Sequence, residues 1–347
     1  MKFLILDTKQ LKIVLRNLKN KTVSSRLFNN YKNMHNISVI LVIPILLGGL
    51  IVFLYSIRRL SIAMQHLFTE HTKKIITRYT NNIFSSILIG IIVTIFLGSS
   101  SAVIIITIVF INSRSLNFKQ AMGIIMGANI GTTFSSQLIA LNISGYTIIS
   151  LVIGFIIWLF SKSSKTKKTG EILMYFGLLF FGLYLLETSV APLKDSELFT
   201  KWVLQINNPL KGVAVGGLLT LIIQSSSATI GILITLAKQQ LIGFPSALAI
   251  MLGAELGTCS DTLIAVIGGS RDAIRAGVFH LLFNFIPILL GLLLFDYFEE
   301  FIKWISLTGS IHTQLANGHV LFSVLSVLLF LPFINFVYRL VHFMVPN

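Results

Sequence analysis

The sequence predicts an all-α, polytopic helical membrane protein made of two pseudo-symmetric repeats with broken or re-entrant helices. Of its 347 residues, 54% are hydrophobic and only 11% are charged, whereas a soluble globular protein carries about 25% charged residues. The apolar runs are continuous and do not alternate, which is typical of membrane helices rather than of lipid-facing strands. Two polar motifs that recur at one spacing indicate the internal repeats.

The first 36 residues form a basic segment that we expect to lie in the cytoplasm. They contain eight Lys or Arg residues, and basic flanks of membrane helices stay inside. Leu11, Val14, Leu15 and Leu18 have helical spacing within it, which favours an amphipathic helix on an anionic leaflet. No cleavable signal peptide is recognised, so the first apolar run would anchor the chain in a bacterial inner membrane.

The remaining chain is divided by its apolar runs and by a lysine-rich link. Several runs are long enough to cross a hydrocarbon core of about 30 Å as helices. Arg58 and Arg59 follow the first run, and they would face outside if that run were a simple crossing from a cytoplasmic N-terminus. The number of crossings and the orientation of the repeats therefore stay open. The apolar runs lie at residues 37–57, 83–111, 118–141, 144–160, 172–192, 212–238, 244–268, 274–297 and 319–343. The predicted parts are repeat 1 at 37–160, a basic linker at 161–170, repeat 2 at 171–310, and a last transmembrane helix with the C-terminus at 311–347.

Charge and cysteine content exclude several classes of protein. The formal net charge is +15, but the basic residues gather in the N-terminal segment and in the linker, where they serve as membrane flanks. We therefore expect a lipid bilayer and no nucleic acid as partner. Cys259 is the only cysteine, so the chain has neither an intrachain disulfide nor a cysteine-based metal site.

Serine triplets are the first repeated motif. Residues 98–102 read Gly-Ser-Ser-Ser-Ala, and residues 224–228 read Gln-Ser-Ser-Ser-Ala. Three adjacent serines put hydroxyls on every side of a helix, so we expect the backbone to break there. A helix that restarts after a break offers free N–H groups and a positive dipole end to an oxyanion, most naturally phosphate, although sulfate or a carboxylate satisfies the same physics. A single triplet is better explained by helix packing, but the matched pair favours one midplane site. The predicted phosphate-binding residues are Ser99, Ser100, Ser101, Gln224, Ser225, Ser226 and Ser227.

The second repeated motif follows each triplet at the same spacing. Residues 127–133 read Gly-Ala-Asn-Ile-Gly-Thr-Thr, and 126 residues later 253–259 read Gly-Ala-Glu-Leu-Gly-Thr-Cys. The paired glycines alone fit close helix packing, but the interleaved polar groups could also coordinate sodium. The predicted sodium-binding residues are Asn129, Thr132, Thr133, Glu255, Thr258 and Asp261. Sodium would be a coupling ion, and we expect no other metal and no cofactor.

Four polar residues of the apolar second repeat, two of them named above, need a separate interpretation. A carboxylate in the bilayer must be paired, protonated or bound to a cation, and Glu255 replaces Asn129 of the first repeat. Asp261 is six residues further on, so both carboxylates join one site only if the backbone breaks between them. His280 and Asn284 share one helix face, and they either line the polar interior in a supporting role or simply join two helices.

These motifs resemble the type II sodium/phosphate cotransporter family, over roughly residues 40 to 310. That family carries Gln-Ser-Ser-Ser in each repeat, a following Gly-Ala-Asn-Ile-Gly-Thr segment, and His-x-x-Phe-Asn in its second half, which residues 280–284 match. The resemblance implies sodium-coupled movement of phosphate, with both serine motifs at the substrate site. The chain departs from the pattern at Gly98, Glu255 and Asp261, so the resemblance does not fix the sodium stoichiometry.

We therefore expect a secondary active transporter that carries inorganic phosphate and sodium together by alternating access, and not an enzyme. A transporter of another oxyanion and a proton-coupled phosphate transporter are the nearest alternatives. A phosphate sensor without transport is a third, and an intramembrane hydrolase using a serine and His280 lacks a nucleophile elbow. The direction of transport stays open, as does the choice between a monomer and a homodimer.

Overall fold

The computed structural model describes residues 44–65, 76, 79–141, 147–190, 208–307 and 309–346. The described residues form helices and connecting turns and contain no strand, which confirms the predicted all-α class. Within the described part of the chain, five helices are long and apolar enough to cross a membrane. The N-terminal segment 1–36, with its predicted amphipathic helix and cytoplasmic location, lies outside the described residues.

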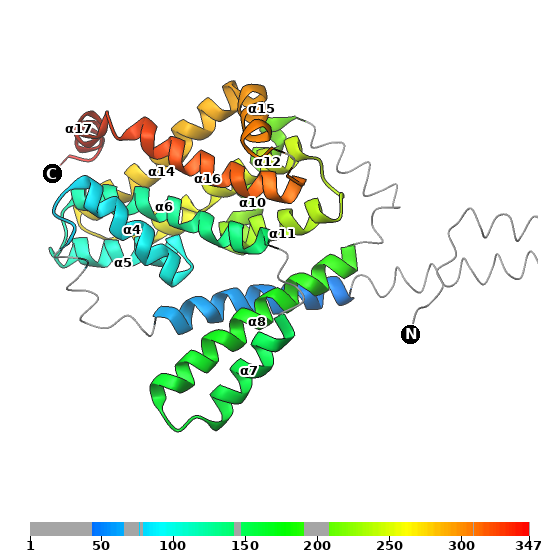
Figure 1. Cartoon of the computed structure of the whole chain (residues 1–347). Coiled ribbons are helices and arrows are strands. Elements are labelled where there is room, and N and C mark those ends of the chain that lie inside the picture. Colours follow the sequence, from blue (N-terminus) through cyan, green and yellow to red (C-terminus); the bar gives the residue numbers. More distant parts are fainter. Residues whose placement is uncertain are drawn as a thin grey trace, which may run out of the picture.

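Figure 1 shows how the described helices are arranged along the chain. The first, which we call helix 44–65 (Pro44–Gln65), is drawn in blue without a label. The others are α4 (Ile83–Leu97), α5 (Ser100–Asn112), α6 (Phe118–Ala140), α7 (Thr147–Phe160), α8 (Ser164–Val190), α10 (Pro209–Ile223), α11 (Ser226–Lys238), α12 (Phe244–Gly257), α13 (Cys259–Ala265), α14 (Arg271–Leu293), α15 (Phe295–Ile305), α16 (Ile311–Phe330) and α17 (Ile334–Met344).

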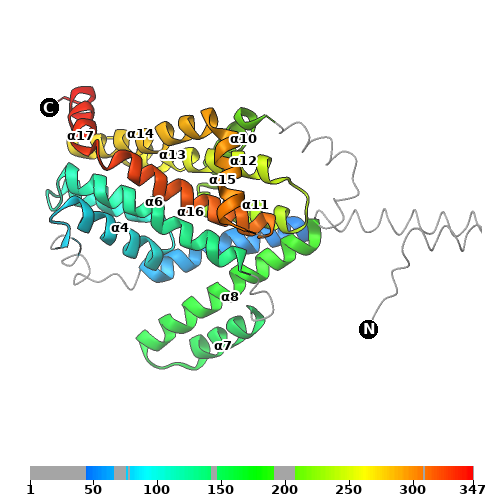
Figure 2. The ribbon, with the colours of Figure 1, turned by 45° about the horizontal axis from the view of Figure 1, so that its top comes forward.

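Two helical hairpins, α4–α5 and α10–α11, enter the molecule from opposite ends (Figures 1 and 2). Helix α5 ends beside the start of α14, where Asn112 Oδ1 accepts a hydrogen bond from Ser270 N at 2.9 Å. Helix α11 ends beside the last turn of α6, where Lys238 Nζ donates to Ile139 O at 3.3 Å. The hairpins are thus antiparallel, and their tips face the middle of the molecule. A pseudo-symmetry that relates two whole repeats stays a prediction.

Each hairpin turns at a serine triplet, because the backbone there ends one helix and caps the next. Gly98 closes α4 in the left-handed region at φ 63°, and Gln224 closes α10 at φ 57°. Ser99 then caps α5 by accepting from Ala102 N, and Ser225 caps α11 by accepting from Ala228 N, both at 3.2 Å. The structure therefore contains the helix break that the adjacent serines predict.

Glycines hold each hairpin against the helix that follows it. A Cβ atom on Gly127 of α6 would lie 2.0 Å from Ile87 O of α4, and one on Gly253 of α12 would lie 2.0 Å from Val213 O of α10. These distances are far below van der Waals contact, so only glycine permits the approach. The paired glycines consequently have the packing role that their spacing indicates. One hydrophobic cluster surrounds α5 and α6, and a second surrounds α11 and α12.

The boundaries of three predicted segments differ in the structure. Helix 44–65 continues past residue 57, so Arg58 and Arg59 are helical and do not begin a loop. The expected linker 161–170 is a turn at 161–163 followed by the first residues of α8. The prediction of one last span at 319–343 is wrong, because α16 ends at Phe330 and α17 starts at Ile334. Pro332 lies between them and lacks the N–H that a continuous helix needs.

Candidate functional site

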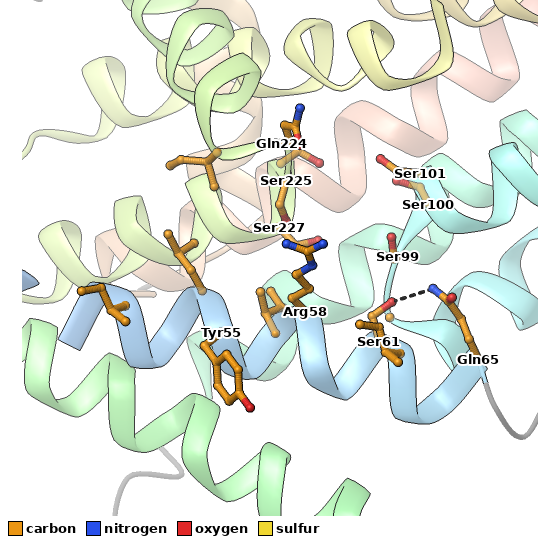
Figure 3. A pocket seen from close by; sticks show the side chains of 17 residues that line it. Tyr55, Arg58, Ser61, Gln65, Ser99, Ser100, Ser101, Gln224, Ser225 and Ser227 are labelled. Carbon is orange, nitrogen blue, oxygen red and sulfur yellow. Dashed lines mark hydrogen bonds between the residues drawn. The ribbon is translucent and has the colours of Figure 1, made fainter. Parts of the chain in front are cut away.

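A cavity of about 690 Å³ lies where the tips of the two hairpins meet helix 44–65 (Figure 3). The first tip contributes residues 98–101, the second contributes residues 223–227, and helix 44–65 provides the facing wall. All seven residues predicted to bind phosphate line this cavity. The structure thus brings together two motifs that are 126 residues apart in the sequence.

The tips present hydrogen-bond donors to the cavity. Helices α5 and α11 both begin there, so their first backbone N–H groups have no intrahelical partner. Ser100 and Ser226 are buried at the first position of each helix. The Ser101 hydroxyl instead donates to Asp261 Oδ2 on α13 at 2.8 Å. The site therefore consists mainly of donors, which suits an anion with several oxygen atoms.

Arg58 adds a positive charge that the sequence analysis missed. Its side chain extends from helix 44–65 toward Ser227 of the second tip (Figure 3), and it lines the cavity. Among the described residues no ion pair or hydrogen bond to Arg58 is found, whereas its neighbour Arg59 contacts Tyr175 at 3.1 Å and Glu171 at 3.8 Å. No sequence motif singled out Arg58; its place in the cavity follows from a helix that continues from Pro44 through Gln65.

The six residues predicted to bind sodium lie outside the lining of the cavity. The Asn129 amide donates to Ile125 O at 3.0 Å, which leaves its side-chain oxygen available. The hydroxyls of three threonines also donate to carbonyls of their own helix at 2.7 to 3.1 Å, as helix packing alone would give. These threonines are Thr132, Thr133 and Thr258.

Glu255 and Asp261 contact different partners and do not form one site. Glu255 Oε1 lies 3.0 Å from His319 Nε2 of α16, and His319 Nδ1 lies 2.7 Å from Ser136 Oγ of α6. All three residues of this chain are buried. Asp261 does not line the cavity, but it accepts a hydrogen bond from Ser101, which does. His319 and Ser136 were missed from the sequence. A histidine at the start of the apolar run 319–343 was a signal for His319, and no motif singled out Ser136.

His280 and Asn284 join α14 to α13 and do not line the cavity. His280 Nδ1 lies 2.7 Å from Thr262 Oγ1, and Asn284 Nδ2 donates to Cys259 Sγ at 3.4 Å. The structure thus favours the helix-joining interpretation of the two that the sequence left open. Among the described residues no group of three His, Cys, Asp or Glu side chains could hold a metal ion.

Comparison with known proteins finds similarity over most of the chain. The model of the Na+/Pi-cotransporter family matches residues 52–188 and 196–317. "Uncharacterized protein YqeW" of Bacillus subtilis is 30% identical over 269 residues, which cover 77% of this chain and 87% of that protein. "Putative inorganic phosphate export protein YjbB" of Escherichia coli is 25% identical over 250 residues, 71% of this chain and 45% of that protein.

Similarity to animal proteins is confined to a shorter segment. "Sodium-dependent phosphate transport protein 2A" of Mus musculus is 27% identical over 143 residues, 37% of this chain and 22% of that protein. No solved structure matches the chain significantly. The family match covers both hairpins and helix 44–65 from residue 52 onward, and therefore most of the cavity wall. The chain belongs to the Na+/Pi-cotransporter family, which is a family of transporters and not of enzymes.

Proposed function

We propose that the chain is a secondary transporter that moves inorganic phosphate across a bacterial inner membrane by alternating access, with sodium as the coupling ion. The observation that carries this proposal is that both serine triplets and Arg58 line one cavity between hairpins that enter from opposite ends. Membership of the family supports phosphate as the transported ion. A site formed by broken helices between two repeated units is common in transporters that work by alternating access.

The charge of the cavity fits a divalent anion. Each helix start contributes about +0.5 of an elementary charge, so the starts of α5 and α11 together contribute about +1. Arg58 adds one full positive charge, which brings the total to about +2. This total balances the charge of hydrogen phosphate near neutral pH. The guanidinium also offers paired N–H donors that match two phosphate oxygens.

Sodium supplies the energy that moving this anion inward demands. Carrying two negative charges into a cell against about 100 mV costs about 4.6 kcal/mol. Each sodium ion returns about 2.3 kcal/mol from the same potential, so two ions offset the electrical cost. We assign the coupling sodium to oxygen atoms near Asn129, Thr132, Thr133 and Thr258. We leave Glu255 out of this set, because its carboxylate faces His319.

Labelled phosphate flux in proteoliposomes, with and without a sodium gradient, tests the proposal. Arg58→Gln should weaken phosphate binding about thirtyfold, because a charged hydrogen bond contributes about 2 kcal/mol. Arg59→Gln is the matched control, since Arg59 is paired with residues of α8 and is not among the residues that line the cavity. Equal phosphate affinity in the two variants would contradict the assignment of Arg58.

A second pair of variants tests the hairpin tips. Ser100→Leu and Ser226→Leu each put a bulky side chain beside a helix start that lines the cavity. Both should abolish phosphate uptake in protein that remains monodisperse in detergent. Normal uptake by both variants would refute the site. Sulfate and arsenate as competitors against labelled phosphate distinguish a phosphate carrier from a general oxyanion carrier.

Export is a second candidate for the direction of transport. The name of the Escherichia coli relative concerns phosphate export, although the matched region covers only 45% of that protein. Vesicles of known orientation, loaded with phosphate on one side, give the direction under a physiological sodium gradient. Net uptake from the outside supports sodium symport, and net efflux supports export. The choice between a monomer and a homodimer and the location of the N-terminus stay predictions.

A further inference from the structure

The buried chain Ser136–His319–Glu255 connects the two halves of the protein. Ser136 belongs to α6, the helix packed against the first hairpin, and Glu255 belongs to α12, the helix packed against the second. His319 of α16 lies between them, 2.7 Å from the serine hydroxyl and 3.0 Å from the carboxylate. The side chain of His319 is 0% exposed and that of Glu255 is 3% exposed. Water therefore does not solvate the charge of this pair.

A proton is the cation that this geometry provides for. If the carboxylate is ionised and the imidazole is neutral, the pair buries one uncompensated negative charge, which is costly in a membrane interior. One added proton makes the pair neutral. The first half has no such buried charge, because the uncharged Asn129 stands at the matching position.

Other ionisable groups on the neighbouring helices do not replace His319. Asp261 is bonded to Ser101, and His280 is bonded to Thr262. Cys259 of α13 lies one turn beyond Glu255 and contacts the carbonyl oxygen atoms of Glu255 and His280 rather than the carboxylate. The remaining groups lie toward the ends of longer helices or on the short helix α15. Those of the longer helices are Lys119, Lys211, Lys238, Arg271, Asp272, Arg275 and His312, and those of α15 are Asp296, Tyr297, Glu299, Glu300 and Lys303. Among the described residues, His319 alone forms an ion pair with Glu255.

We propose that Glu255 and His319 bind one proton as a second coupling ion beside sodium, with Ser136 orienting the imidazole. This inference rests on the proposed function, because the proton is coupled to phosphate movement. Loss of the proton removes the attraction between α16 and α12, and each of α6 and α12 is locked to a hairpin by glycine contacts. The protonation state therefore acts on the relative position of the two tips that line the cavity.

Two assays on the full-length protein separate coupling from transport. The first measures exchange of labelled for unlabelled phosphate across proteoliposomes at equal pH on both sides. The second measures net uptake driven by an imposed pH gradient, with the same sodium concentration on both sides of the membrane. In the unmodified protein both should occur. If the unmodified protein shows no phosphate exchange, the proposed function fails, and the coupling proposal fails with it. If it exchanges phosphate but shows no uptake driven by the pH gradient, only the coupling proposal fails.

Substitution of Glu255 or His319 should affect the two assays to different extents. Glu255→Gln and His319→Gln should each lower uptake driven by the pH gradient at least tenfold, while exchange falls less than threefold. His312→Gln is the matched control, because it removes a histidine of the same helix that lies at its first turn. Glu255→Asn, which copies the residue of the first half, is a second variant for the case that a glutamine prevents folding. Proton-driven uptake that survives in these variants overturns the proposal, and so does a parallel loss of both activities in folded protein.

Discussion

The hairpins α4–α5 and α10–α11 share a backbone and differ in their polar side chains. Helix α10 begins 126 residues after α4, and α11 begins 126 residues after α5. The turns between the helices have nearly the same φ, 63° at Gly98 and 57° at Gln224. The hydrogen bonds around the turns are different. The same main-chain frame therefore carries two different sets of side-chain chemistry.

The differences concern groups that could hold charge or a hydrogen bond. In the second hairpin Thr220 Oγ1 donates to Thr229 Oγ1 at 2.9 Å. In the first, Thr94 Oγ1 is buried without a partner among the described residues, because Val103 stands where the second hairpin has Thr229. A similar contrast exists between Asn129 and the pair of Glu255 with His319. We propose that the shared frame builds the anion site and that the differing groups adjust its coupling.

The largest effect should come from the glycines that both halves share. Gly127→Ala and Gly253→Ala each place a Cβ 2.0 Å from a carbonyl oxygen of the neighbouring helix. The helices must separate, so each variant should lose about 3 kcal/mol of stability. Melting of purified protein in detergent measures the loss. Gly48→Ala is the control, because no atom lies within 4 Å of its added Cβ. A loss in only one of the two variants would break the equivalence of the halves.

The next effect should distinguish matching serines. Ser101→Ala removes the donor that contacts the half-buried Asp261, and an unsatisfied buried acceptor costs about 2 kcal/mol. Ser227→Ala changes the matching position, where no hydrogen bond of the side chain is found among the described residues. Its stability should change by less than about 0.5 kcal/mol. Equal melting temperatures of the two variants would show that the Ser101–Asp261 bond does not stabilise the fold.

A smaller effect should follow when the threonine pair is removed from the second hairpin or introduced into the first. Thr229→Val leaves Thr220 without its partner and should cost about 1 kcal/mol. Val103→Thr offers a hydroxyl to the buried Thr94 and should add about 0.5 kcal/mol. Urea or thermal unfolding of the purified variants measures both changes. Opposite signs would support the comparison, and a loss in both would indicate that Val103 is needed for packing.

Much of this arrangement follows from local sequence. Adjacent serines, a left-handed cap and paired glycines are short-range signals, so the breaks at residues 98 and 224 and the packing role of the glycines could be predicted. The joining of both triplets in one cavity also followed from the repeat. The end of α16 at Phe330 was missed, because Pro332 is a single residue within an otherwise apolar run.

Contacts between segments that are distant in the chain could not be predicted from the sequence. Arg58 comes from helix 44–65, outside both motifs, and its place in the cavity depends on how that helix crosses the hairpin tips. The pairing of Glu255 with His319 joins residues 64 apart in the chain, and Ser136 is 183 residues from His319. No periodicity or propensity specifies such pairs, because they result from the packing of α6, α12 and α16.

The smallest expected effect concerns the turn residues themselves. Gln224→Gly relieves a left-handed conformation that costs a side chain about 1 kcal/mol, and the greater freedom of glycine in the unfolded chain takes back about half of this gain. Stability should therefore rise by about 0.5 kcal/mol, while phosphate affinity falls because an amide leaves the cavity wall. Gly98→Gln is the reciprocal change; no atom lies within 4 Å of its added Cβ, so the cost is conformational. It should lose stability and gain phosphate affinity, measured by thermal unfolding and by phosphate titration. If both substitutions weaken phosphate binding, then Gly98 is matched to its own tip, and the asymmetry of the two hairpins is itself a requirement of the site.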